Sequence, residues 1–322
     1  MAPPVDATAS APVDPPAVRA GATDRDDPTR SILLLLVAMA SFCVSDVVAK
    51  SLTLPSIQIA WLRWVGFILI MAPLLILSRG AVLRTGSLRA QVLRGLGMVV
   101  SAITFIVGLH HLPMANATAT AFAAPLIVTA LSIPMLGEKV GARRWAATGV
   151  GLVGVLVVVR PGTGSFDPAS VFPLLSALAW AFTIVFTRVT SRTDGPMTTM
   201  AWGAVVGVVA LSLMVPFDWR TPTATELGWV SLMAAMSTFG QFLTILAYRG
   251  APASLLVPFS YSQIIWSSLA GALVFATIPD LPTWIGAAII VASGVYTAHR
   301  ERVRAREARL APPAALTPGR VG

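Results

Sequence analysis

Residues 110–162 read HHLPMANATATAFAAPLIVTALSIPMLGEKVGARRWAATGVGLVGVLVVVRPG, two apolar runs joined by a basic loop. A second version of this stretch, YRGAPASLLVPFSYSQIIWSSLAGALVFATIPDLPTWIGAAIIVASGVYTAH, occupies residues 248–299. Two residue pairs keep the same separation of 139 positions: Pro113 with Pro252, and Trp145 with Trp284. The chain is therefore organised as two related halves, offset from each other by about 139 residues.

The composition predicts an integral membrane protein. Of 322 residues, 56% are hydrophobic and only 11% are charged, and the mean hydropathy is +0.78. These values lie outside the range of soluble globular domains. The net charge of +9 would indicate nucleic-acid binding in a soluble protein. Here most Arg residues lie in loops between apolar runs, so membrane topology explains the charge better and no nucleic-acid partner is expected.

Ten apolar runs are long enough to cross a bilayer as helices, which predicts an all-α protein with ten transmembrane helices. Their approximate spans are 32–50, 57–77, 91–110, 114–136, 143–159, 169–188, 197–216, 227–247, 252–277 and 283–299. We expect residues 30–162 and 163–299 to form two five-helix repeats. Residues 1–29, rich in Pro, Ala and Asp, are expected to be a disordered cytoplasmic tail, and residues 300–322 a basic cytoplasmic tail.

The distribution of basic residues predicts the orientation. If the N-terminus faces the cytoplasm, most of the 23 Lys and Arg residues fall on the cytoplasmic side. Cytoplasmic loops of membrane proteins carry such an excess of basic residues. We therefore expect a protein of the bacterial inner membrane with both termini in the cytoplasm. Because each half holds an odd number of helices, the second half must enter the membrane upside down. The basic joint GEKVGARR (137–144) accordingly corresponds to IPDLPT (278–283), which has no Lys or Arg.

An inverted repeat is typical of alternating-access carriers, whose substrate site lies near the middle of the membrane between the halves. The alternative is a duplicated helix bundle that transports nothing. The single cysteine, Cys43, excludes an intrachain disulfide and any paired-cysteine metal motif. No phosphate-binding loop, zinc motif or catalytic triad signature occurs, so no cofactor, metal or enzymatic activity is expected.

Several segments resemble the EamA-type repeats of the drug/metabolite transporter superfamily, over about residues 30–301. They are SDVVAK (45–50), WLRW (61–64), LPMANATATAFAAPLIVTAL (112–131), LGEKVGARRW (136–145), GVLVVVRPG (154–162) and AYRGAPASLLVPFSYSQIIW (247–266). Within the superfamily they are similar to a bacterial branch known for uptake of S-adenosylmethionine or riboflavin, which the resemblance implies as substrates. One departure is that Ala276-Thr277 stands where the family pattern has a Gly-Glu pair, matching Gly137-Glu138 of the first half.

Asp46, Lys50 and Arg63 are charged residues inside the first two predicted spans. A charge at such a depth costs about 2.5 to 3.5 kcal/mol on insertion scales, so each needs a reason to be there. Asp46 and Lys50 share one helical face and can neutralise each other. In a functional interpretation, Asp46 pairs with Arg63 in one state and releases it to an anionic substrate group in another. In the alternative, the ion pair is static, and Lys50 and Arg63 extend to the lipid headgroups.

The predicted ninth helix carries Pro258 beside a polar and aromatic group that includes Tyr261, Gln263 and Trp266. The corresponding stretch of the fourth helix runs from Asn116 to Pro125. Broken helices at matching positions are a sequence signature of a carrier site, so these residues are candidates to bind substrate. Trp180 and Gln241 are further candidates for the same cavity. The alternative for the small polar residues is ordinary helix packing.

Glu138, in the cytoplasmic joint, is a candidate gate residue, or alternatively a helix cap. His110 and His111 are more simply explained as solvated residues at a helix end. Together these features predict a secondary transporter that moves a small polar or amphipathic metabolite through the lipid bilayer. An exporter of amino acids or toxic metabolites, a non-transporting scaffold and a membrane-embedded transferase are the alternatives. Whether the protein forms a homodimer stays open.

Overall fold

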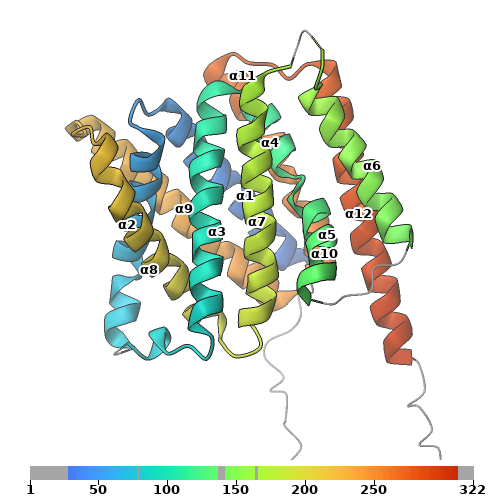
Figure 1. Cartoon of the computed structure of the whole chain (residues 1–322), viewed down its shortest axis with the longest axis horizontal. Coiled ribbons are helices and arrows are strands. Elements are labelled where there is room, and N and C mark those ends of the chain that lie inside the picture. The colour runs from blue at the N-terminus through green and yellow to red at the C-terminus, as the bar shows by residue number, and fades with distance from the viewer. Residues whose placement is uncertain (1–27, 79, 137–141, 164–165, 252, 311–322) are drawn as a thin grey trace, which may run out of the picture.

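A computed structural model describes residues 28–78, 80–136, 142–163, 166–251 and 253–310. Within these ranges every regular element is a helix (Figure 1). The first half contains α1 (Pro28–Ser51), α2 (Ser56–Leu77), α3 (Leu88–His111), α4 (Met114–Ala121), α5 (Ala124–Leu136) and α6 (Ala142–Val159). The second half contains α7 (Val171–Thr190), α8 (Pro196–Met214), α9 (Ala224–Gly250), α10 (Ala253–Ser260), α11 (Ser262–Phe275) and α12 (Leu281–Leu310). Short 3-10 turns lie at Ala81–Leu83, Pro168–Ser170 and Val215–Asp218.

Each of the ten predicted runs coincides with one helix or with a pair of consecutive helices. The fourth run is divided into α4 and α5, and the ninth into α10 and α11. Both divisions lie close to a proline, Pro125 or Pro258, because proline lacks the N–H that continues a helix. The division residues, Phe122 and Tyr261, are 139 positions apart, like the proline and tryptophan pairs of the sequence.

Most of the helices have the length and composition of membrane spans. Eight segments among the described residues are at least 18 residues long and apolar enough to cross a bilayer, and Trp145–Val159 is a shorter apolar helix. Large apolar side chains such as Leu69, Ile76 and Leu273 are exposed on the outside of the bundle. Such a surface fits lipid rather than water.

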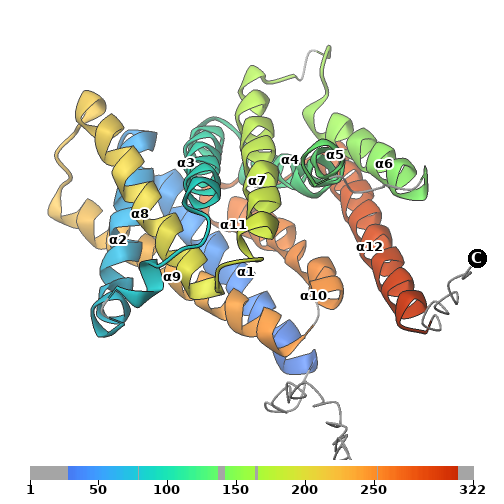
Figure 2. The same ribbon diagram turned by 60° about the horizontal axis from the view of Figure 1, so that its bottom comes forward.

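The helices of the two halves are interleaved. The most extensive contacts are those of α1 with α9, of α3 with α7 and of α6 with α12. Each of these pairs takes one helix from each half, so the halves are not separate bundles. In both views α2 and α8 lie at one edge of the molecule, and α6 and α12 lie at the other (Figures 1 and 2). The beginning of α1 and the end of α12 lie towards the lower end of Figure 1.

The contact between α6 and α12 depends on two glycines. A Cβ atom on Gly154 would lie 2.8 Å from the carbonyl oxygen of Gly286, and one on Gly286 would lie 2.6 Å from the carbonyl oxygen of Gly154. Small residues allow such close approach of transmembrane helices. Nearby, the Ser293 hydroxyl donates a hydrogen bond of 2.6 Å to the Ala147 carbonyl. The helix pair is therefore held by backbone proximity and an interhelical hydrogen bond.

We predict that Gly286→Leu lowers the thermal unfolding midpoint of the detergent-solubilised protein, because overpacking a close contact costs about 1 to 3 kcal/mol. Gly228→Leu is the matched control, since no atom lies within 4 Å of the Cβ that it adds. Equal midpoints for the two variants would contradict this account of the α6–α12 contact.

Candidate functional site

The carboxylate of Asp46 is the centre of a buried polar cluster. Asp46 lies on α1 and is only 7% exposed. Arg63 of α2 donates from Nη2 to Oδ1 at 3.3 Å, and Gln263 of α11 donates from Nε2 to Oδ2 at 3.4 Å. The cluster therefore joins two helices of the first half to one of the second. Three of the predicted site residues meet here.

Two polar atoms of this region hold no hydrogen bond among the described residues. They are Nε of Arg63 and the hydroxyl of Ser262, which precedes Gln263 on α11, and both are buried. Buried polar groups are almost always paired, because leaving one unpaired costs about 1 to 3 kcal/mol. The Asp46 cluster therefore retains hydrogen-bonding capacity that a polar solute or water would satisfy.

Lys50 does not neutralise Asp46, which corrects one interpretation of the sequence. Its Nζ donates to the backbone carbonyls of Leu109 and Leu112, the latter at 2.7 Å, and lies 5.4 Å from the ring centroid of Phe275. The last carbonyls of a helix have no partner within it, so a cation at this end of α3 satisfies them. The partner of Lys50 is the end of a helix, which the spacing within α1 could not reveal.

Tyr261 lies in the apolar core beside the helix divisions. Its side chain is 3% exposed, and its ring centroid is 5.0 Å from that of Phe122. A Cβ on Gly294 would lie 1.8 Å from the Tyr261 hydroxyl, so only glycine leaves room for this tyrosine. The two division residues thus pack against each other, and the structure does not bring Tyr261 into hydrogen-bond contact with Asp46.

Asn116, near the start of α4, belongs to a different polar site. Its side-chain oxygen accepts a hydrogen bond of 3.1 Å from Thr283. It lines a cavity of about 290 Å³ together with Arg160 and Asp280, which form an ion pair between the joints that follow α6 and α11. Partial burial would raise the pKa of Asp280. The hydrogen bonds from Thr283 and the ion pair outweigh this effect and hold its pKa below the ordinary value.

The remaining predicted site residues lie outside both polar groups. Trp180 and Trp266 are 43% and 36% exposed, and Gln241 of α9 is half-buried. None of the three holds a side-chain hydrogen bond within the part of the chain that the structure describes. Glu138 falls outside the described residues.

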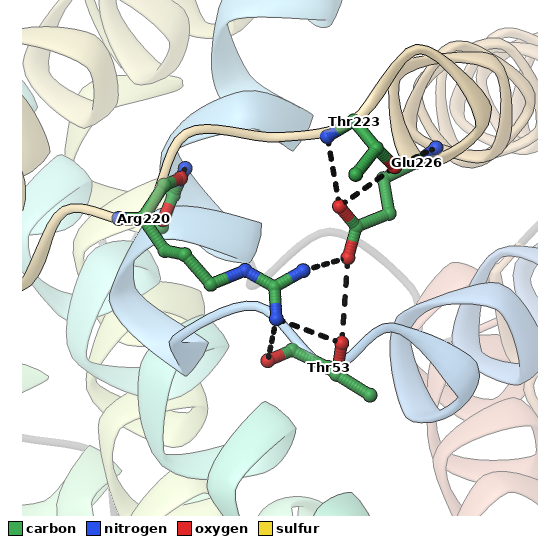
Figure 3. Close-up of polar contacts among 5 residues, drawn as sticks. Thr53, Arg220, Thr223 and Glu226 are labelled. Carbon is green, nitrogen blue, oxygen red and sulfur yellow. Dashed lines mark hydrogen bonds and ion pairs between the residues drawn. The ribbon is translucent and has the colours of Figure 1, made fainter.

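A polar network that sequence reasoning missed joins the α1–α2 joint to the α8–α9 joint (Figure 3). Arg220 forms an ion pair with Glu226 and donates to the Thr53 hydroxyl at 3.1 Å. Glu226 also accepts a 2.9 Å hydrogen bond from the Thr223 backbone N–H, and it receives a further one from the Thr223 hydroxyl. The buried amide of Gln58 accepts from and donates to the backbone of Arg220. The spacing of Thr223 and Glu226 is that of a capping box, which is the signal that could have revealed them.

A second missed network, at the lower end of Figure 1, joins the α7–α8 joint to the α2–α3 joint. Asp194 accepts hydrogen bonds from the Thr85 hydroxyl, from the Gly86 backbone N–H at 2.8 Å and from the Gln91 amide at 2.7 Å. Desolvation would raise the pKa of Asp194. The hydrogen bonds outweigh it and lower the pKa from 3.8 to about 2. The carboxylate is therefore charged at neutral pH and holds the two joints together.

These features define a class of protein: a multi-pass helical membrane protein whose two halves meet at buried charged groups. The EamA-like transporter family model matches residues 29–160 and again 168–297. The chain belongs to this family, so the family predicted by resemblance is confirmed.

Curated relatives carry transporter names. The chain is 26% identical to an S-adenosylmethionine uptake transporter of Rickettsia prowazekii (strain Madrid E), over 84% of this chain and 93% of the relative. It is 30% identical to a riboflavin transporter of Vibrio cholerae serotype O1, over 88% and 97%. A protein of known crystal structure matches with a TM-score of 0.58 at 21% identity, covering 87% of this chain and 99% of its own, which supports the fold.

We predict that Asp194→Asn lowers the thermal unfolding midpoint at neutral pH, because the amide replaces a charged acceptor of several hydrogen bonds. Since the pKa is lower in the folded state, the stabilisation is complete above about pH 5 and is lost as the pH falls towards about 2. Midpoints of wild type and variant, measured in steps from pH 7 to pH 3, should therefore converge. A difference that stays constant over this range would contradict the assignment.

Proposed function

We propose that this protein is a secondary transporter of the bacterial inner membrane. It moves a small polar or amphipathic metabolite by alternating access between two inverted five-helix repeats. The observation that carries this proposal is the Asp46 cluster, in which Arg63 of the first half and Gln263 of the second bind one buried carboxylate. Relative motion of the halves changes the surroundings of this carboxylate, which is the requirement for a site with alternating access.

Pairs of equivalent contacts support the inverted arrangement. The Ser45 hydroxyl of α1 donates to the Met233 carbonyl of α9 at 3.1 Å. The Thr183 hydroxyl of α7 donates to the Arg94 carbonyl of α3 at 3.4 Å. Exchanging the two halves converts the first contact into the second, since α1 corresponds to α7 and α9 to α3. A pseudo-twofold relation between the halves accounts for both contacts.

A second pair of contacts follows the same exchange. A Cβ on Gly95 of α3 would meet Val206 of α8, and a Cβ on Gly66 of α2 would meet Ala234 of α9. Gly95 and Ala234 are 139 positions apart, and Gly66 and Val206 are 140 positions apart. The proposed repeats therefore comprise residues 30–162 and 163–299. The Arg-rich lower joints and both termini face the cytoplasm.

The exchange of partners at Asp46 provides the transport step. In the described arrangement Arg63 neutralises Asp46, and Gln263 completes its hydrogen bonds. An anionic or hydrogen-bond-accepting group of the solute competes for Arg63, while Asp46 turns to a donor or cationic group of the same solute. Because a buried charge is costly without a partner, the empty and loaded forms each stay paired, and the forms between them are disfavoured.

The proposed substrate class follows from the relatives and from the site. S-adenosylmethionine and riboflavin appear in the names of the relatives, and both are polar molecules with a planar ring system. A cluster with a carboxylate, a guanidinium and an amide fits such a molecule better than a purely apolar one. The same cluster would also serve export, so the direction of transport is part of the test.

We predict that Asp46→Asn and Arg63→Gln each reduce transport by about tenfold or more, because each removes a charged partner of the substrate or of the other residue. The measurement is flux of labelled S-adenosylmethionine and riboflavin in proteoliposomes, in both directions, with and without a pH gradient. Asp218→Asn and Arg89→Gln are matched controls, because both residues are exposed. If Asp46→Asn and Arg63→Gln both show wild-type flux, the proposal is contradicted and the contact between the two residues is a static ion pair.

A further inference from the structure

Arg94 of α3 is a buried cation whose charge has no carboxylate partner among the described residues. The residue is 7% exposed, and the hydrogen bond that its Nη1 donates to the described residues goes to the sulfur of Met98, at 3.2 Å. Its Nε is buried and donates to no acceptor in the part of the chain that the structure describes. A guanidinium is always charged in proteins and presents five N–H donors, so a thioether alone leaves it far from satisfied.

The guanidinium does not extend towards the lower end of the molecule. One turn nearer that end, the Gln91 amide contacts Asp194 and lies 3.4 Å from the Thr199 hydroxyl of α8. The Nη1 atom of Arg94 lies 3.1 Å from the point where a Cβ on Gly203 would stand, one turn further along α8. The guanidinium is therefore held inside the bundle at the level of Gly203, in space that the missing side chain of this glycine leaves free.

Asp194 is the acidic group of the nearby α7–α8 joint, and it is already engaged. Thr85, Gly86 and Gln91 donate to it, and its hydrogen bonds hold its pKa near 2. It is therefore not a spare counter-ion for Arg94.

The other half provides an internal comparison. Arg94 and Met233 are equivalent, because their carbonyls accept the corresponding hydrogen bonds from Thr183 and Ser45. Met233 is fully buried, so an uncharged side chain satisfies the packing at this position. A charge at the position of Arg94 is thus not needed to build the fold.

The helices that make these two hydrogen bonds differ at the next residue. Ser45 is followed by Asp46, whose carboxylate binds Arg63, whereas Thr183 is followed by Ile184. At the α1–α9 interface, the carboxylate beside the hydrogen bond therefore pairs with an arginine of the same half, Arg63. The equivalent interface contains an arginine and no carboxylate.

We propose that Arg94 binds an anionic oxygen group, a carboxylate or a phosphate, which supplies the counter-charge that Asp46 supplies to Arg63. This inference rests on the proposed inverted arrangement and deepens it. In this inference, Arg63 binds the anionic group of the solute first. Arg94 then binds the same group when α3 and α8 separate at the lower end of the molecule. Guanidinium forks bind such groups through two parallel hydrogen bonds. A phosphate of a lipid headgroup has the same chemistry and is the second source of the ligand.

The test measures binding to the purified full-length protein in dodecyl maltoside, a detergent without phosphate. The probes are S-adenosylmethionine, its carboxyl methyl ester and phosphatidylglycerol. We expect Arg94→Met, which copies Met233, to weaken S-adenosylmethionine binding about tenfold and to leave ester binding unchanged. Arg89→Met, an exposed arginine of the same helix, should bind both like wild type. If Arg94→Met folds poorly, Arg94→Lys keeps the charge without the fork and should give a smaller loss.

The outcomes separate the two sources and the two proposals. Loss of S-adenosylmethionine binding in the Arg94 variants supports a solute anion. A thermal shift by phosphatidylglycerol that Arg94→Met alone lacks supports a lipid phosphate, and does so even if S-adenosylmethionine neither binds nor is transported. Arg94 variants that bind S-adenosylmethionine and phosphatidylglycerol like wild type overturn the inference, as does a wild-type protein that binds neither of these two probes. The proposed transport function would still stand after such a result if flux depends on Asp46.

Discussion

The need to pair one buried carboxylate shapes the centre of this protein. Asp46 lies in a helix with the composition of a membrane span, where an isolated charge is strongly disfavoured. Arg63 compensates its charge from α2, and Gln263 of α11 adds a hydrogen bond, so the partners of a single carboxylate come from both halves. The contact therefore links the charge state of the site to the relative position of the halves, which is the physical basis of the proposed transport cycle.

The two divided helices are the second constraint. Irregular backbone at membrane depth is tolerated only where protein or a polar cavity surrounds it. Here the division residues Phe122 and Tyr261 pack against each other, so each division covers the other. Gln263 follows its division by two residues, which brings a polar side chain to the depth of Asp46. The divisions thus allow polar groups to enter the centre of an otherwise apolar bundle.

Much of the fold could be predicted from the sequence, because span length and hydropathy are local properties. The pairing of Asp46 with Arg63 was also predictable, since few charges occur within the spans. The partner of Lys50 was not, because it donates to carbonyls at the end of α3, whose position depends on the packing of distant helices. The networks of Arg220 and Asp194 were missed for the same reason. They join loops more than a hundred residues apart, which no periodicity reveals.

The inverted arrangement underlies both the proposed transport and the role of Arg94, and labelling from the two sides of the membrane tests it most directly. Thr53 and Thr193 are exposed residues of equivalent joints, 140 positions apart, and the native Cys43 is buried. Single Thr53→Cys and Thr193→Cys variants are treated in intact cells with a maleimide that cannot cross the inner membrane. The account predicts labelling of the first variant in intact cells, and of the second only after permeabilisation. Labelling of both variants from the same side would contradict it.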